Sequence, residues 1–332
     1  MRLNELGEGK MVAWMQALLD GQPDLKLGIG DDSAVMAIGD IDLVLTSDIL
    51  LQDTHIYKGM TPYQAGMKVA TCNFSDLAAM GARPRGFLLS IGTSPSEPAE
   101  SFKDIVRGAS SVCKGVGATY AGGDMTSSEK LILSGFAFGT SDSGRVLTRK
   151  GASPGDILAI TGHIGSSACG WQILQNKGID SLDVFSLGER KAIEKKILKA
   201  TLEPVARVKE GLLLADSGFV TSCIDVSDGL AVSLKHMQDN NGFVLDESAI
   251  PVEPEVRLVC ERLGLDYEKT VYHVGEDFEL LFTVKSGCWD ELAGQVKGIT
   301  KIGEVTSKGI DIKRADGKIE PLDTGGYDHF SA

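Results

Sequence analysis

The chain has 332 residues, of which 42% are hydrophobic and 24% are charged, and this length favours two domains, each able to bury a core. Its 46 acidic and 33 basic residues give a net charge of −13, which disfavours a nucleic-acid partner. No apolar stretch is long enough for a membrane span and the N-terminus lacks a signal-peptide pattern, so we expect a cytoplasmic protein with no membrane partner. Six widely spaced cysteines indicate neither a zinc site nor a disulfide framework.

The first elements in chain order end in acidic residues. Residues 4–20 show helical spacing of Met11, Trp14, Met15, Leu18 and Leu19, which predicts a helix that packs through this face. Two apolar strands follow, over residues 25–30 and 41–45. The first runs into Asp31-Asp32 and the second into Thr46-Ser47-Asp48, so both acidic groups are expected at strand ends.

A long helix is predicted from Thr61, a good N-cap followed by Pro62, to about Met80. Asn73 and Asp76 would share one face of it. Another helix is expected near residues 101–118, and strands over 131–139 and 156–161. The Gly- and Pro-containing stretch 148–155 has the composition of a joint, so we expect domains over residues 1–147 and 148–332.

The second half also mixes strands and helices. Strands are predicted over 222–226 and 278–284, and helices over 228–237 and 289–296. This mixture in both halves indicates an α+β or α/β fold class.

The common nucleotide-binding signatures are missing. The sequence has no G-x-x-x-x-G-K-[ST], no complete G-x-G-x-x-G and no protein-kinase motif set. The five histidines form no H-x-x-x-H pair, and Ser227 has no evident histidine partner for acyl chemistry. Any use of ATP must therefore follow another design.

A series of aspartates beside glycine or hydroxyl residues offers that design. They are Asp31, Asp32, Asp48, Asp76, Asp124, Asp225 and Asp228. Carboxylate oxygens suit Mg²⁺, which also takes substrate phosphates as ligands. Each aspartate alone is equally well explained as a turn or helix-cap residue, but their joint position after apolar runs favours metal binding.

Three further features keep two interpretations each. Gly122-Gly123-Asp124 fits a phosphate-binding backbone or an ordinary hairpin turn. Arg149 could hold a phosphate or form a surface salt bridge. His55 could be structural, and Glu276 could occupy a turn or anchor a substrate ring.

Taken in order, eight motifs resemble those of the thiamine-monophosphate kinases, a family in the superfamily of aminoimidazole ribonucleotide synthetase and selenophosphate synthetase. The motifs span nearly the whole chain, and their joint order is specific. They are Gly30-Asp31-Asp32-Ser33-Ala34, Thr46-Ser47-Asp48, the segment 73–82, Gly122-Gly123-Asp124-Met125-Thr126, the segment 148–152, the segment 225–230, the segment 275–281 and Asp328-His329-Phe330.

The resemblance implies a two-domain α+β architecture like that of aminoimidazole ribonucleotide synthetase, in which the N-terminal domains of a homodimer pair into a barrel. It also implies site residues for ATP, for thiamine monophosphate and for Mg²⁺. The metal ligands would be Asp32, Thr46, Ser47, Asp48, Asp76, Asp124, Asp225 and Asp228. The ATP contacts would be Gly123, Asp124, Arg149 and Ser227, and the acceptor contacts would be His55, Glu276 and Tyr327.

Three positions depart from the family pattern: Val106 replaces an aromatic residue, Met125 a threonine, and Val274 the first glycine of Gly-Gly-Glu-Asp. They affect nucleotide contacts more than reaction class.

The implied reaction is direct in-line transfer of a phosphoryl group from ATP to thiamine monophosphate with several Mg²⁺ ions and no dedicated general base. The alternatives are another ATP-dependent superfamily enzyme, such as aminoimidazole ribonucleotide synthetase, and a nucleotide-binding sensor without turnover.

Overall fold

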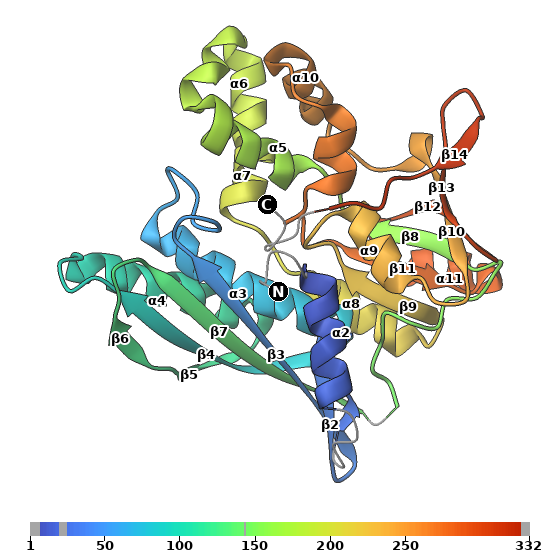
Figure 1. The fold of residues 1–332 in the computed structure, drawn as a ribbon, viewed down its shortest axis with the longest axis horizontal. Helices are drawn as coiled ribbons and strands as arrows, with labels where there is room; N and C mark the ends of the chain where they lie inside the picture. Colours follow the sequence, from blue (N-terminus) through green and yellow to red (C-terminus); the bar gives the residue numbers. More distant parts are fainter. Residues whose placement is uncertain (1–6, 20–24, 143, 327–332) are drawn as a thin grey trace.

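The computed structural model describes residues 7–19, 25–142 and 144–326. Within these ranges the chain forms two seven-stranded sheets, one from each half of the sequence (Figure 1). Helices α3 (Pro62–Ala79) and α8 (Val208–Ser217) lie between them. The mixed α/β class predicted from the sequence is confirmed.

The N-terminal sheet has the order β1-β2-β3-β7-β4-β5, with β6 also paired to β4. Its longest pair joins β3 and β7 in antiparallel register from Ile41 opposite Asp142 to Leu51 opposite Ile132. Within the described residues this sheet remains open and forms no closed barrel. The strands are β1 (Leu25–Leu27), β2 (Ala34–Ile38), β3 (Ile41–Leu51), β4 (Arg83–Thr93), β5 (Thr119–Gly122), β6 (Met125–Ser127) and β7 (Ile132–Asp142).

Helices α3 and α4 (Ala99–Val116) cover one face of this sheet. The predicted start of α3 is confirmed, because Thr61 and Gln64 form a reciprocal capping box and Pro62 takes the first helical position. The two helices approach closely at Gly66 and Gly108. A Cβ at either glycine would overlap the backbone carbonyl of Ile105 or Tyr63 on the other helix.

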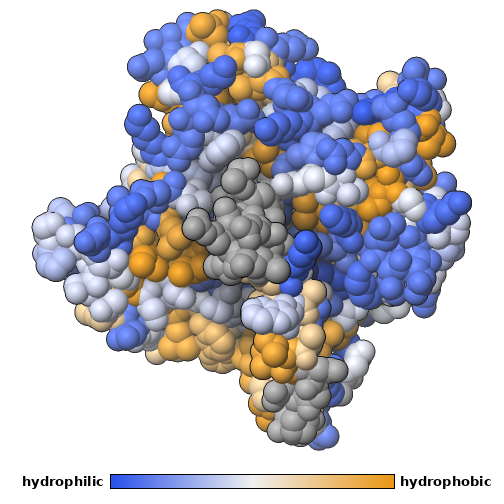
Figure 2. All heavy atoms as spheres, viewed as in Figure 1, coloured by the Kyte–Doolittle hydropathy of each residue, from blue (hydrophilic) through white to orange (hydrophobic). Residues whose placement is uncertain are grey.

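The other face of the N-terminal sheet is rich in exposed apolar side chains. Alternate residues of a strand point to opposite faces, and the outward set on β3 includes Ile41, Ile49 and Leu51, which are 40–55% exposed. Figure 2 shows hydrophobic residues gathered over this part of the molecule. This face is a candidate interface.

The C-terminal sheet has the order β14-β13-β10-β12-β8-β11-β9. Its strands are β8 (Ile157–Thr161), β9 (Val220–Asp225), β10 (Gly242–Asp246), β11 (Leu280–Val284), β12 (Ile299–Thr306), β13 (Ile310–Lys313) and β14 (Ile319–Pro321). The remaining α-helices of this half are α5 (Ser166–Gln172), α6 (Leu187–Ile193), α7 (Lys199–Leu202), α9 (Leu230–Met237), α10 (Pro254–Leu263) and α11 (Trp289–Gln295).

One hydrophobic core spans both halves. It joins residues of α3 such as Phe74 and Leu77 to Leu214 of α8 and to Phe282 of β11. A second core lies within the C-terminal half and includes Ile160, Leu234 and Phe243. Because α3 is buried from both sides, the side chains on it are held firmly at the boundary between the two sheets.

Two sequence predictions about local structure need correction. Helix α2 (Glu8–Leu18) forms, but its expected packing residues are largely exposed: Trp14 is 64%, Leu18 65% and Leu19 52% accessible. Strand β4 was not predicted, because its opening Arg83-Pro84-Arg85-Gly86 has the composition of a turn. No helix within residues 7–19, 25–142 and 144–326 combines the length and apolar character needed to span a bilayer.

Candidate active site

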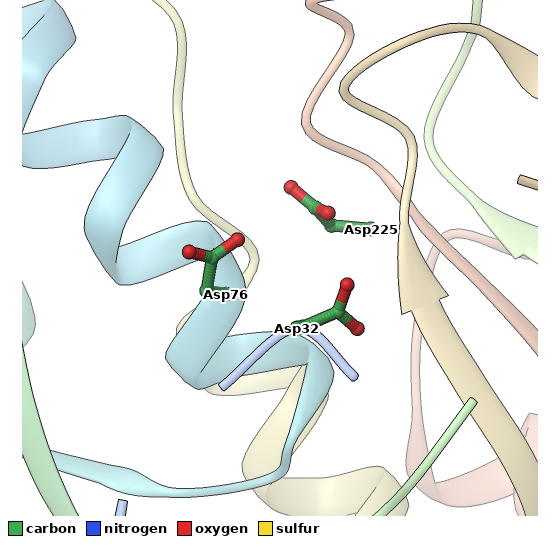
Figure 3. Close-up of side chains that lie close together, drawn as sticks. All are labelled: Asp32, Asp76 and Asp225. Atoms are coloured by element: carbon green, nitrogen blue, oxygen red, sulfur yellow. The ribbon is translucent and has the colours of Figure 1, made fainter. Parts of the chain in front are cut away.

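Three aspartates from distant parts of the sequence meet where the two halves of the molecule face each other. Asp32 precedes β2, Asp76 lies in the last turn of α3, and Asp225 ends β9 (Figure 3). One carboxylate oxygen of each lies within 4.8 Å of one oxygen of the other two. These three residues, called here the carboxylate cluster, are all among the predicted metal ligands.

Two further predicted ligands act on the cluster through their charge. Burial raises the pKa of Asp76, and Asp48, on the inward face of β3, raises it further; burial likewise raises the pKa of Asp225, and Asp228 adds to that effect. Thr46, two residues before Asp48 on the same face, donates its hydroxyl to Asp76 at 2.5 Å. Thr46 and Asp48 therefore lie inside β3 and not after its end as the sequence predicted, because the strand continues to Leu51, but the alternation of side chains still turns both to the inward face.

Burial is the main cause of the perturbed acidity at the cluster. It raises the pKa of Asp32 to about 8 and those of Asp48 and Asp225 to about 6, and it also raises the pKa of Asp76. Repulsion between neighbouring carboxylates adds to this effect. Burial therefore makes these carboxyl groups hard to ionise unless a cation compensates their charge.

The compensation that the chain offers is partial. Arg149 donates Nε and Nη2 to one oxygen of Asp32 at 2.9 and 2.6 Å, and its backbone N–H faces Asp31. Ser75 donates its hydroxyl to Asp225 at 2.6 Å. One guanidinium and a few hydroxyls cannot balance this many carboxylates.

Two buried carboxylate oxygens, Oδ2 of Asp32 and Oδ2 of Asp48, have no hydrogen-bond partner in the described part of the chain. Such groups are rare because desolvation without a partner is costly. Several buried oxygen donors without enough protein cations are the ligand set that Mg²⁺ prefers. The residues present therefore fit a magnesium site.

A second polar cluster lies further along α3. Lys68 donates Nζ to both carboxylate oxygens of Glu276 at 2.7 Å and to the carbonyl of His55 at 2.9 Å. The hydroxyl of Tyr57 also donates to Glu276, and Nζ of Lys68 lies 3.8 Å from the centroid of the Tyr57 ring. Lys68, Tyr57 and Glu276 are called here the lysine cluster.

Two loops, over residues 226–228 and 274–278, are joined by backbone hydrogen bonds beside these clusters and are called here the fastened loops. The N–H of Glu276 donates to the carbonyl of Ser227 at 2.6 Å, and the N–H of Phe278 donates to Val226 at 3.0 Å. Asp277 accepts from the N–H groups of Gly165 and Ser167. The predicted ATP contact Ser227 and the predicted acceptor contact Glu276 are therefore direct neighbours.

The remaining predicted residues lie apart from the carboxylate cluster. Ser47 points to the opposite face of β3 from Thr46, and its hydroxyl donates to the carbonyl of Gly135. Asp124 borders a surface pocket with Ser90 and Ser134, and Gly123 packs so tightly on β4 that a Cβ would overlap the carbonyl of Leu89. Tyr327 and the motif 328–330 fall outside the described residues.

Comparisons with known proteins assign the chain to a family. Residues 30–141 match the model described as AIR synthase related protein, N-terminal domain. A thiamine-monophosphate kinase of Pyrococcus horikoshii is 34% identical, with 91% of each chain covered, and one of Escherichia coli K12 is 33% identical, with 98% of each covered. The chain belongs to the thiamine-monophosphate kinase family.

The whole fold agrees with this family. The solved structure of AaThiL complexed with AMPPCP and TMP is 26% identical to this chain, superposes with a TM-score of 0.85, and the match covers 99% of both chains. The resemblance stated from the sequence motifs is confirmed, and it extends over both halves of the chain.

Sequence reasoning missed Lys68 and Tyr57. The signal for Lys68 was present, because a lysine on a predicted apolar helix, eight residues before Asp76, shares its face with the acidic end. No local signal could show its partner, because Glu276 lies 208 residues away.

Of the three departures from the family pattern, Val106 packs against the core and Met125 is 68% exposed on β6.

Proposed function

We propose that this protein catalyses ATP-dependent phosphorylation of thiamine monophosphate to thiamine diphosphate. The observation that carries the proposal is the convergence of Asp32, Asp76 and Asp225, beside the unpartnered oxygens of Asp32 and Asp48, in a chain of this kinase family. The complex of AaThiL with AMPPCP and TMP supports the choice of donor and acceptor.

The proposed chemistry is one in-line displacement. An oxygen of the acceptor phosphate attacks the γ-phosphorus of ATP, a new P–O bond forms, the bond to the β–γ bridging oxygen breaks, and ADP leaves. A phosphate monoester has a second pKa of about 6, so the nucleophile is already ionised at neutral pH and needs no dedicated base. Catalysis then depends on positioning and on charge.

The chain's own residues would supply these two requirements. Asp32, Asp48, Asp76, Asp225 and Asp228 would hold Mg²⁺, together with Thr46, Ser47 and Asp124 as the resemblance implies. When bound, several Mg²⁺ ions would neutralise and align the phosphate oxygens of both substrates.

The substrate contacts follow the same scheme. The ATP contacts would be Gly123, Asp124, Arg149 and Ser227, and those of the acceptor would be His55, Glu276 and Tyr327. The fastened loops support this assignment. The hydrogen bond between the backbones of Glu276 and Ser227 would keep an acceptor contact next to an ATP contact, as transfer between the two substrates requires.

Turnover with defined acceptors tests the function. Purified protein with ATP and Mg²⁺ is given thiamine monophosphate, free thiamine, formylglycinamidine ribonucleotide or no acceptor, and products are separated by chromatography. We expect thiamine diphosphate and ADP from the monophosphate alone. Consumption of the ribonucleotide instead would favour the synthetase, and ATP binding without any ADP release would favour the sensor.

We also propose a homodimer and two domains divided near residue 148. The open apolar face of the N-terminal sheet supports pairing of two such sheets into a shared barrel, since exposed apolar patches of this kind mark interfaces. The two sheets, formed by residues on either side of 148, support the division. Sedimentation of the wild type and of Ile49→Lys tests the dimer: the variant should sediment as a monomer.

A further inference from the structure

A fully buried lysine stands in the middle of α3. The side chain of Lys68 is 0% exposed, and burial of an ammonium group is unfavourable unless hydrogen bonds and an opposite charge compensate it. Its donors reach the carbonyl of His55 and the carboxylate of Glu276, and its charge lies over the ring of Tyr57. Among the described residues, the hydrogen bonds of this lysine are therefore directed at the loop before α3 and at Glu276.

Glu276 is held from two directions. Its backbone has a φ of +64°, a conformation that costs energy in a residue other than glycine, and the hydrogen bond to Ser227 keeps it there. Its side chain is held by Lys68 and Tyr57, which come from the N-terminal half. A residue keeps a strained backbone conformation only where several surrounding contacts hold it, and such residues are common at functional sites.

The two charged partners differ in access. The side chain of Glu276 remains 24% exposed, whereas that of Lys68 is completely covered. A ligand can reach the carboxylate and cannot reach the ammonium group. Lys68 can therefore influence a ligand only through the direction and charge of Glu276.

The chemistry of the proposed acceptor suits such a carboxylate. Thiamine carries an exocyclic amine, which is a hydrogen-bond donor, and a positively charged thiazolium ring. A carboxylate of fixed direction accepts from the first and attracts the second, and fixing it before binding reduces the entropy lost on association. ATP offers no comparable cation.

We propose that Lys68, with Tyr57, is a positioning residue that orients the Glu276 carboxylate toward the amine-bearing, cationic part of the acceptor substrate without touching that substrate. This inference rests on the proposed function for the identity of the acceptor. It assigns the lysine cluster to acceptor recognition and the carboxylate cluster to the phosphates.

Steady-state kinetics of Lys68→Met test the inference, because methionine keeps an unbranched side chain and removes the charge. We expect the KM for thiamine monophosphate to rise at least about tenfold, which corresponds to about 1.4 kcal/mol, while the KM for ATP stays within about twofold. The matched control is Lys114→Met, an exposed lysine of α4, which should leave both constants unchanged. A purely structural role would alter both KM values or only the amount of folded protein.

The double variant Lys68→Met with Glu276→Gln gives the sharper result. If Lys68 acts through Glu276, the double variant should raise the acceptor KM no further than Glu276→Gln alone. Additive effects, or an unchanged acceptor KM in Lys68→Met, would overturn the inference. Should Lys68→Met not fold, as judged by its thermal melt, Tyr57→Phe replaces it and must raise the acceptor KM selectively. Absence of wild-type turnover would instead refute the proposed function.

Discussion

The carboxylate cluster and the lysine cluster both bury acidic groups beside α3, but they are compensated differently. Glu276 accepts hydrogen bonds from a lysine and a tyrosine of its own chain, whereas Oδ2 of Asp32 and Oδ2 of the neighbouring Asp48 have no hydrogen-bond partner among the described residues. A carboxylate that the protein neutralises is ready to orient a ligand. The carboxylate cluster, which Arg149 compensates only in part, fits a cation from solution, so we expect the two clusters to differ in role.

The largest expected effect comes from reducing the charge of the carboxylate cluster. Asp76→Asn should lower kcat by about 100-fold or more, because a metal-held phosphate loses several kcal/mol of charge stabilisation. Initial rates over a magnesium titration measure it. Near-normal rates at limiting magnesium would show that Asp76 is no metal ligand, and Asp104→Asn on the exposed face of α4 is the control.

The next largest effect should follow from removing the guanidinium that pairs with Asp32 in the carboxylate cluster. Arg149→Gln leaves Asp32 without its paired charge and should lower kcat/KM for ATP by about 10- to 100-fold, since breaking a buried pair is strongly unfavourable. Arg149→Lys should recover part of this, because it keeps the charge but loses the forked geometry. Equal activity of the two variants would mean that the charge alone contributes nothing, whereas wild-type activity of Arg149→Lys would mean that the forked geometry is unimportant.

The burial of aspartates at and beside the carboxylate cluster also predicts how the free energy of unfolding depends on pH. Burial raises the pKa values of Asp32, Asp48 and Asp225 above that of an unfolded aspartate, so the folded state binds more protons than the unfolded state. Stability in EDTA should therefore be highest at acidic pH, fall as the pH rises above the unfolded pKa of about 4, and lose the last of this contribution near pH 8. Melting temperatures should drop by a few degrees over this window, and added Mg²⁺ should restore them most at pH 8. A flat profile in EDTA would contradict the expected fall in stability.

The smallest effect is expected from a neutral donor. Ser75→Ala removes the hydroxyl that donates to Asp225. Burial raises the pKa of Asp225 and this hydrogen bond lowers it, so loss of the bond makes the carboxylate harder to ionise. Loss of one hydrogen bond of about 1 kcal/mol should raise the magnesium concentration for half-maximal activity about fivefold. A change in maximal rate with an unchanged magnesium requirement would place Ser75 outside metal binding.

The carboxylate cluster could be predicted from the sequence because its members follow apolar strands or lie at a helix end, where local patterns are readable. Thr61 and Pro62 likewise fixed the start of α3. The lysine cluster could not be predicted, because Lys68 and Glu276 meet only through the packing of the two halves. Exposure on α2 also escaped prediction, since helical spacing identifies an apolar face but not whether another surface covers it.

The fastened loops have a consequence for which substitutions the chain tolerates. A Cβ at position 275 would overlap the carbonyl of Ser227, whereas Val274 has an ordinary extended backbone with a φ of −113°. A mutational scan should therefore find position 274 permissive and position 275 restricted to glycine. The valine that departs from the family's glycine pair occupies the position where a side chain is sterically allowed.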